Sequence, residues 1–216
     1  MNLLFIGSPG SGKGTQAQYL VSKKNFKHIS TGDIFRKNLK EKTPIGLEAQ
    51  NYIEKGELVP DTITIKMVEL ALKNTSMDRD SIFDGFPRNQ TQTEAFNEIL
   101  KNRNQKLDLV LYLKVSDSEV VARLTGRLWA PKSGCIYHIK NKAPKIKGIC
   151  DQSGEPLIVR KDDQKEVVLD RLKIFWENTE PLLTYFNQQG ILKTVDGERP
   201  SDQILEDILS ALKKVI

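Results

Sequence analysis

The sequence has 216 residues, of which 38% are hydrophobic and 28% charged, so it is long enough to bury one sizeable core. This composition excludes a disulfide-stapled miniprotein, and the hydrophobic content excludes a disordered or collagen-like chain. The 33 basic and 28 acidic side chains give a net charge of +5, which indicates anionic partners without distinguishing nucleotides from nucleic acids.

No segment has the pattern of a targeting signal or a membrane span. The chain runs from Met1 to Gly7 directly into a loop, without a charged segment, an apolar stretch and a cleavage site in succession. No apolar run approaches the roughly 20 residues that cross a bilayer. The two cysteines, Cys135 and Cys150, lie in one short stretch. We therefore expect a soluble, cytoplasmic protein from a reducing compartment.

Short apolar runs alternate with stretches that have the apolar spacing of helices. The first run, residues 3–6, is continuous and is typical of a strand buried on both faces of a parallel sheet. Further strand-like runs cover residues 82–83, 109–113 and 191–195. Helical spacing lies between the runs and also covers residues 164–188 and 201–215. This alternation predicts an α/β fold, with a doubly wound parallel sheet flanked by helices.

Two segments depart from the alternation and are predicted to be insertions. In residues 30–59, a polar residue is well placed to cap a helix, Pro44 opens a second helix and Gly56 ends it. In residues 126–163, glycines and prolines break the chain into short, lysine-rich runs, which predicts a small β-type flap. The core domain then comprises residues 1–29, 60–125 and 164–216.

The most specific motif is GSPGSGKGT at residues 7–15, between a predicted strand and a predicted helix. In this context backbone N–H groups wrap a polyphosphate, the helix N-terminus adds positive potential and Lys13 reaches the outer phosphates. A glycine turn that merely joins strand to helix is the alternative, and it does not explain the lysine. The general motif has Ser or Thr directly after the lysine, whereas here Gly14 intervenes before Thr15.

That departure is informative, because the loop resembles that of the nucleoside monophosphate kinases, and specifically of the adenylate kinase family. Three further elements follow in the family's order: STGDIFR at residues 30–36, DGFPR at 84–88, and arginines that flank the flap. The resemblance spans nearly the whole chain. It implies a P-loop fold with a five-stranded parallel sheet, a helical AMP-binding (NMP) domain at residues 30–59 and a long lid domain at 126–163.

Phosphoryl transfer between two polyanions requires charge neutralisation and positioning, a task that suits the arginine guanidinium. Seven of the nine arginines lie at positions that the resemblance assigns to nucleotides. It implies a catalytic group formed by Lys13, Arg88, Arg127, Arg160 and Arg171.

The resemblance also implies two nucleotide sites. The ATP site would comprise Gly10, Ser11, Gly12, Lys13, Gly14, Thr15, Arg123, Arg127, Ile136, Tyr137 and Arg199. The AMP site would comprise Thr31, Arg36, Glu57, Leu58, Val59, Gly85, Phe86, Pro87, Arg88, Gln92, Arg160 and Arg171. Arg123 would share a helix face with Arg127 if the helix continues that far. The Gln92 amide suits an adenine edge, which favours AMP as the acceptor.

Asp84 follows a predicted strand, where a P-loop enzyme keeps a carboxylate for the Mg²⁺ shell, here through water. A turn-starting aspartate before Gly85 is the alternative. The flap also raises a zinc hypothesis. In zinc-bearing relatives, however, the four ligand positions correspond to Ala130, Ser133, Cys150 and Ser153, of which only Cys150 is a good ligand, so we expect no structural zinc site. Trp129 and Tyr137 are expected to pack inside the flap.

The resemblance implies adenylate kinase activity: reversible, Mg²⁺-dependent transfer from ATP to AMP, giving two ADP and maintaining adenine nucleotide balance. It also implies a monomer, and we expect no nucleic-acid or membrane partner. Three alternatives stay open. They are a sister kinase that uses GTP or another monophosphate, a nucleic-acid-binding protein that uses its basic flap, and a nucleotide sensor without turnover.

Overall fold

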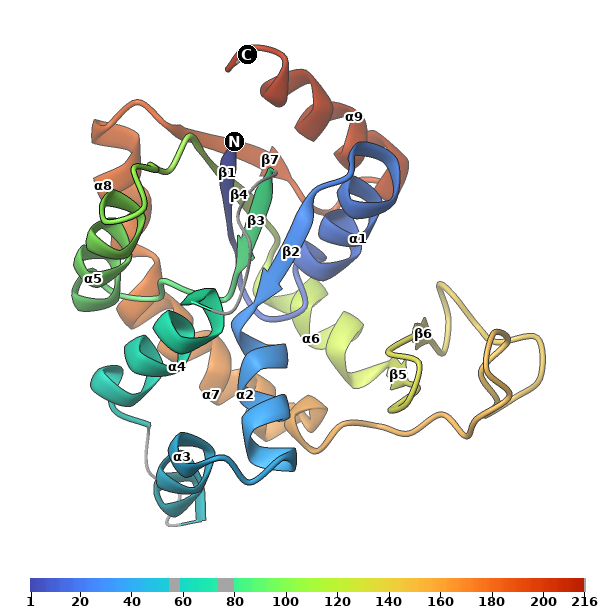
Figure 1. Cartoon of the computed structure of the whole chain (residues 1–216). Helices are drawn as coiled ribbons and strands as arrows, with labels where there is room; N and C mark the ends of the chain where they lie inside the picture. The colour runs from blue at the N-terminus through green and yellow to red at the C-terminus, as the bar shows by residue number, and fades with distance from the viewer. Residues whose placement is uncertain (55–58, 74–79, 216) are drawn as a thin grey trace.

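Five parallel strands form the centre of the molecule in the computed structural model, which describes residues 1–54, 59–73 and 80–215 (Figure 1). Neighbouring strands are all parallel. Across the sheet their order is β2 (Lys27–Ser30), β3 (Ser81–Asp84), β1 (Asn2–Ile6), β4 (Leu109–Lys114) and β7 (Leu192–Asp196). The doubly wound α/β sheet that the sequence predicts is thereby confirmed.

Strand β2 falls outside the four apolar runs that predict strands. Its first two residues, Lys27 and His28, are polar and half-buried, and the strand pairs with β3 alone at the edge of the sheet. A strand buried on both faces produces a continuous apolar run, whereas an edge strand does not have to. The sequence pattern therefore missed this strand.

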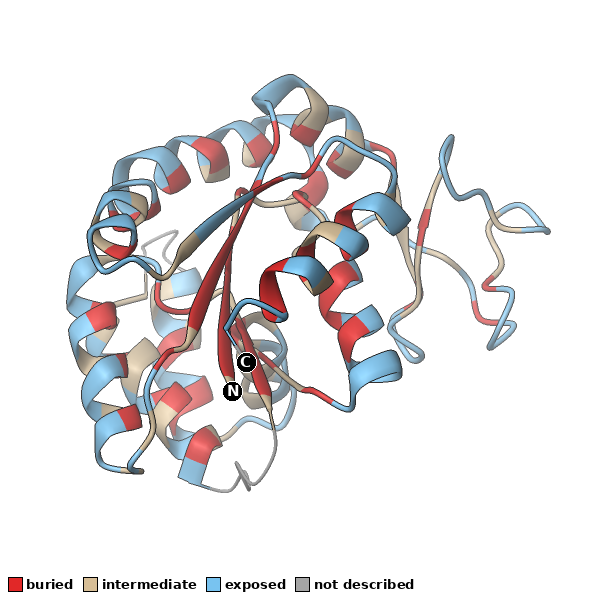
Figure 2. Ribbon diagram, turned by 90° about the horizontal axis from the view of Figure 1, so that it is seen from above, coloured by how far each residue is buried: buried red, intermediate tan, exposed pale blue. Residues whose placement is uncertain are grey.

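Alternate residues of β1 contribute to two cores, one on each face of the sheet. Leu3 and Phe5 pack with residues of α1 (Lys13–Lys24) and α9 (Ser201–Leu212). Leu4 and Ile6 pack with residues of α4 (Asp61–Lys73), α5 (Gln90–Lys101) and α8 (Pro181–Gln188) on the opposite face. Figure 2 shows buried residues along the strands and on the inner sides of these helices. Two covered faces explain the continuous apolar runs.

A third cluster joins α6 (Asp117–Thr125) to α7 (Lys165–Ile174) through Val120, Leu124, Val168 and Leu172. Helix α7 follows a 3₁₀ turn (Lys161–Asp163) and continues through a π-helical turn (Phe175–Thr179) into α8. The predicted helical stretch at residues 164–188 is therefore one run of consecutive helical segments. No helix among the described residues combines the length and apolarity needed to cross a bilayer.

The two predicted insertions contain the expected kinds of element. In the first, α2 (Thr31–Lys40) begins where the Ser30 side chain accepts a hydrogen bond from the Asp33 N–H at 3.3 Å, and α3 (Pro44–Glu54) follows. In the second, β5 (Arg127–Trp129) pairs antiparallel with β6 (Ile136–His138). Gly56, the predicted end of the second helix, lies outside the described residues. The domain boundaries stay a prediction.

Phe96 provides a test of the core. Its side chain is fully buried and meets Phe83 and Phe86 edge-on, with ring centroids 4.7 and 5.8 Å apart. We expect Phe96→Ala to lower the free energy of unfolding by about 3–5 kcal/mol, because it removes an aromatic ring and leaves a cavity. Urea unfolding measures this. Leu169→Ala, at an exposed position of α7, should change it by less than about 0.5 kcal/mol; equal losses would contradict the assigned core.

Candidate active site

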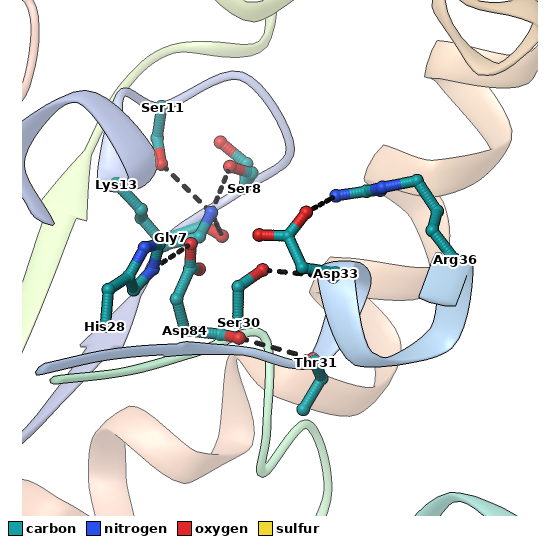
Figure 3. Close-up of polar contacts among 10 residues, drawn as sticks. All are labelled: Gly7, Ser8, Ser11, Lys13, His28, Ser30, Thr31, Asp33, Arg36 and Asp84. Atoms are coloured by element: carbon teal, nitrogen blue, oxygen red, sulfur yellow. Dashed lines mark hydrogen bonds and ion pairs between the residues drawn. The ribbon is translucent and has the colours of Figure 1, made fainter. Parts of the chain in front are cut away.

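The loop between β1 and α1 wraps around the ammonium group of Lys13. Lys13 Nζ donates hydrogen bonds to the Gly7 carbonyl at 2.7 Å, the Ser8 carbonyl at 2.9 Å and the Ser11 hydroxyl at 3.4 Å (Figure 3). Gly10 and Gly12 have φ angles of 79° and 99°, which disfavour a side chain. At Gly10 a Cβ would also lie 2.7 Å from the Leu124 side chain. The loop therefore has the geometry of a phosphate-binding loop that opens a helix.

Lys13 lies in the field of four other charged side chains. Burial lowers the pKa of Lys13 to about 8, and the charges that modify it further belong to Asp84, which raises it, and to Arg88, Arg171 and Arg127, which lower it. The structure thus brings together residues from the loop, from the end of β3, from the start of the flap and from α7. These are four of the five predicted catalytic residues, with the predicted magnesium carboxylate beside them.

Asp84 lies at the carboxyl end of β3, next to the P-loop (Figure 3). Its carboxylate is 3.4 Å from His28 Nε2, and its backbone carbonyl accepts a hydrogen bond from the Thr31 hydroxyl at 3.2 Å. Burial acts to raise the pKa of Asp84, but the contact with His28 and the charge of Lys13 hold it below its ordinary value. An ionised carboxylate is the ligand that Mg²⁺ prefers, so Asp84 fits the predicted role. The part played by His28 was not predicted, because β2 itself was missed.

Arg127, at the start of the flap, and Arg171, in α7, are held by different partners. Arg127 makes two hydrogen bonds to the buried Asp163 carboxylate, at 2.8 and 2.6 Å. Arg171 donates to the carbonyl and the carboxylate of Asp162, both at 2.9 Å. Sequence reasoning located Asp162 and Asp163 at the end of the flap but did not assign them these contacts. The only hint in the sequence was that the two aspartates follow closely after Arg160, which places carboxylates near the predicted cluster of arginines.

On the acceptor side, a hydrogen-bond network fixes the orientation of the Gln92 amide. Its oxygen accepts from the Arg88 N–H at 2.8 Å, and its nitrogen donates to Asp61 at 2.6 Å. Asp61 also accepts two hydrogen bonds from the Asn89 amide, at 3.1 and 2.9 Å. Asp61 was not predicted as a site residue, because its position at the start of α4 indicates only a helix terminus.

Other predicted acceptor residues lie around this network. Gly85 has a φ of 83°, and a Cβ there would lie 2.6 Å from the Thr31 hydroxyl and 3.3 Å from the Arg88 guanidinium. Phe86 and Pro87 are buried and lead into Arg88. Arg36 forms an ion pair with Asp33, in the same helix. Val59 packs beside the cluster formed by α3 and α4. Glu57 and Leu58 lie outside the described residues.

One sequence expectation about the donor side is wrong. Helix α6 ends at Thr125, so Arg127 lies in β5 and does not share a helix face with Arg123. The chain leaves the helix at Gly126, where a Cβ would lie 2.3 Å from His138 Nε2. Arg123 instead pairs with Glu119 within α6 at 2.7 Å. Arg199 pairs with Asp207 at 2.7 Å.

The remaining donor-side residues lie in the loop and the flap. Ser11 is buried, Gly14 is half-buried and the Thr15 side chain is exposed. Ile136 and Tyr137 both belong to β6. The Tyr137 ring is buried and its hydroxyl accepts a hydrogen bond from the Asp151 N–H at 2.8 Å, so this side chain packs inside the flap, as expected. A nucleotide contact at Tyr137 would therefore come from its backbone.

The four positions that correspond to zinc ligands in relatives do meet in the flap. Ala130 and Cys150 pack together with Tyr137, the Ser133 hydroxyl lies 3.7 Å from Cys150 Sγ, and the two serine hydroxyls are 3.3 Å apart. Glu155 accepts hydrogen bonds from the N–H groups of Lys132 and Ser133 and from the Ser153 hydroxyl, at 2.7–2.8 Å. Burial acts to raise the pKa of Glu155, but these bonds hold it at about 2.

Comparison with known proteins finds the adenylate kinase family. The adenylate kinase family model matches residues 5–191. The chain is 43% identical to an adenylate kinase of Clostridium tetani over 212 residues, which cover 98% of each chain. It is 44% identical to an adenylate kinase of Acholeplasma laidlawii, again over 98% of each chain. It is also 44% identical to an adenylate kinase of Finegoldia magna, over 99% of this chain and 100% of the relative.

The family match covers more than half of the chain, and its range, residues 5–191, includes the P-loop, Asp84, Arg88 and the flap. The sequence motifs, the five-stranded sheet and the convergence of cationic side chains agree with it. The chain therefore belongs to the adenylate kinase family, and it is a phosphotransferase that acts on nucleoside monophosphates.

Proposed function

We propose that this chain transfers the terminal phosphoryl group of MgATP to AMP, reversibly, giving two ADP, and that it does so as a cytoplasmic monomer. The observation that carries the proposal is the cluster of cations at the P-loop, where Lys13 lies in the field of Arg88, Arg127 and Arg171. Transfer between two polyanions requires neutralisation of charge and alignment more than covalent chemistry. The nucleotides are the partners that this cluster suits.

The resemblance to the adenylate kinase family suggests the roles of the residues, and the convergence of Lys13, Arg88, Arg127 and Arg171 supports them. Lys13 and the N–H groups of the P-loop would bind the outer phosphates of the donor. Arg88, with Arg36, would hold the phosphate of the acceptor, and Arg127, Arg160 and Arg171 would surround the group in transit. The acceptor oxygen is an anion at neutral pH, so the transfer requires no general base. Cations fixed before the reaction stabilise the charge that develops in the transition state.

Asp84 supports a magnesium ion bound with the donor. The ion would neutralise charge on the phosphate oxygens, as it does in phosphoryl-transfer enzymes generally. Asp84 would hold it through water, and His28 beside Asp84 would keep the carboxylate ionised and oriented. The bound metal would therefore lie between the P-loop and the end of β3.

The two insertions would act as separate units. Residues 30–59 would bind the monophosphate and residues 126–163 would cover the donor. Closure of both over the nucleotides would exclude water, which otherwise competes as a phosphoryl acceptor. The location of α2 and α3 on one side of the P-loop and of β5 and β6 on the other supports this division (Figure 1).

Replacement of Arg88 tests its assigned role. We expect Arg88→Lys to lower kcat by two to three orders of magnitude, about 3–4 kcal/mol, because lysine cannot form the bidentate contact with phosphate. A coupled assay of ADP formation measures this. Arg103→Lys is the matched control, since Arg103 donates to the Leu72 carbonyl away from the site, and it should retain full activity. An unchanged kcat in Arg88→Lys would remove Arg88 from the mechanism.

The pKa of Lys13 predicts how ATP binding depends on pH. Because burial holds this pKa at about 8, the ammonium group loses its proton as the pH rises through 8, and a neutral lysine binds polyphosphate weakly. We expect the Kd for ATP to be constant below pH 7 and to rise toward tenfold per pH unit between pH 8 and 9.5. Isothermal titration calorimetry measures this. The Kd of Lys13→Arg should stay flat over the same range, and an equal rise there would exclude Lys13 as the cause.

The oriented Gln92 amide predicts the choice of acceptor. With one oxygen lone pair engaged by Arg88 and one N–H by Asp61, Gln92 retains one acceptor and one donor, which complement the amino group and N1 of adenine. Phosphorus NMR with MgATP should therefore show ADP accumulating with AMP and little reaction with GMP or UMP. Gln92→Leu should raise the KM for AMP at least tenfold. Faster reaction with another monophosphate would contradict this role of Gln92 while leaving the phosphotransferase chemistry intact.

A further inference from the structure

Trp129 in β5 makes a contact that the sequence did not predict. The guanidinium carbon of Arg160 lies 4.5 Å from the centre of the Trp129 ring. Two backbone hydrogen bonds fix this contact, from Trp129 N–H to the Ile158 carbonyl at 2.8 Å and from Ile158 N–H to the Trp129 carbonyl at 2.9 Å. Trp129 is thereby paired with Ile158, and Arg160, two residues further along, is its diagonal neighbour. Such neighbours lie within reach of a long side chain.

This contact differs from those of Arg127 in the flap and Arg171 in α7. Arg127 and Arg171 are held by the carboxylates of Asp163 and Asp162. Across the residues that the structure describes, Arg160 has no carboxylate within ion-pair distance, and its buried Nε has no hydrogen-bond partner. The face of the Trp129 indole is therefore the partner of the Arg160 guanidinium in this structure, through a cation–π contact.

The charges around Arg160 explain why a partner is needed. Burial, followed by repulsion from Arg127 and Arg36, lowers the pKa of Arg160 to about 10, although the more distant charges of Asp162 and Asp163 act to raise it. The negative face of the indole ring attracts the cation without accepting its N–H groups. A carboxylate would instead engage those donors and would have to be displaced before phosphate could bind.

We propose that Trp129 is a positioning residue for the reaction, which holds the Arg160 guanidinium over its ring with the terminal N–H donors free for the transferred phosphoryl group. The inference rests on the proposed role of Arg160 in transfer. It assigns to Trp129 the pre-organisation of a catalytic cation, in addition to packing within the flap.

The test compares three substitutions at Trp129 by steady-state kinetics. Trp129→Leu should lower kcat on the order of fivefold, because leucine fills the space without a π face, while the KM for ATP changes less than twofold. Trp129→Tyr and Trp129→Phe keep an aromatic face and should retain at least half of kcat. Trp176→Phe is the matched control, since Trp176 donates to Asp117 outside the site, and it should match the unmodified protein. Equal losses in the leucine and both aromatic variants would overturn the proposal.

A double-mutant cycle separates positioning from general damage to the flap. In an Arg160→Ala background, Trp129→Leu should cause no further loss of kcat, because the cation that it positions is gone. If Trp129→Leu costs the same factor in both backgrounds, the residue is purely structural and the proposal fails. If Arg160→Ala alone leaves kcat unchanged, the proposed role of Arg160 fails instead. Circular dichroism melting of each variant confirms that the compared proteins are folded.

Discussion

Four cationic side chains near the P-loop, those of Lys13, Arg88, Arg127 and Arg171, repel one another, and Arg160 adds to the repulsion on Arg127. The contacts around these side chains limit that repulsion. Lys13 is enclosed by carbonyls, Arg127 and Arg171 are held by Asp163 and Asp162, and Arg160 lies on an aromatic ring. Cations fixed in this way spend less energy on reorganisation when a polyanion arrives. The same fields that lower the pKa of Lys13 become favourable once phosphate is bound.

The parallel sheet makes this concentration of charge possible. The carboxyl ends of β1, β2 and β3 lie at one edge, so the P-loop, Thr31 and Asp84 meet although 16 to 77 residues separate them in sequence. The strands are held by two apolar cores, one on each face of the sheet. The stability of the molecule thus resides mainly in the sheet and its helices, while the charged side chains occupy the loops that follow the strands.

Much of the fold and part of the site could be predicted from the sequence, because their causes are local. Continuous apolar runs predicted the buried strands β1, β3 and β4, and the strand-like run at residues 191–195 predicted β7 at the far edge of the sheet. GSPGSGKGT at residues 7–15 predicted the loop around Lys13. The edge strand β2 was missed because one face of it is polar. Contacts that depend on tertiary register were also missed, such as Asp61 with Gln92 and Trp129 with Arg160. No spacing rule connects residues that meet only after the chain has folded.

The end of helix α6 at Thr125 is a second example of a feature that the sequence pattern could not predict. Arg123 and Arg127 have helical spacing, but the helix ends at Thr125, and the close approach of the His138 ring to Gly126 belongs to the folded flap and is invisible in the sequence. The conditional prediction from periodicity therefore failed where a residue from another element lies against the chain. Contacts of this kind, between residues far apart in sequence, are concentrated at the active site because it is assembled from the ends of many helices and strands.

The ion pair between Arg127 and Asp163 joins the first and the last residues of the flap, 36 positions apart in sequence. Together with the pairing of Trp129 with Ile158, it closes the segment into a ring at its base. The entropic cost of closing such a ring rises only slowly as the number of residues in it increases. The middle of the flap, which includes the exposed Ile146, lies outside this closure. Substitutions, insertions or deletions there are therefore expected to change the geometry of the arginines little. The length of the flap can in this sense vary without changing how the active-site arginines are held. The middle of the flap is therefore a suitable place to attach a probe or a second domain.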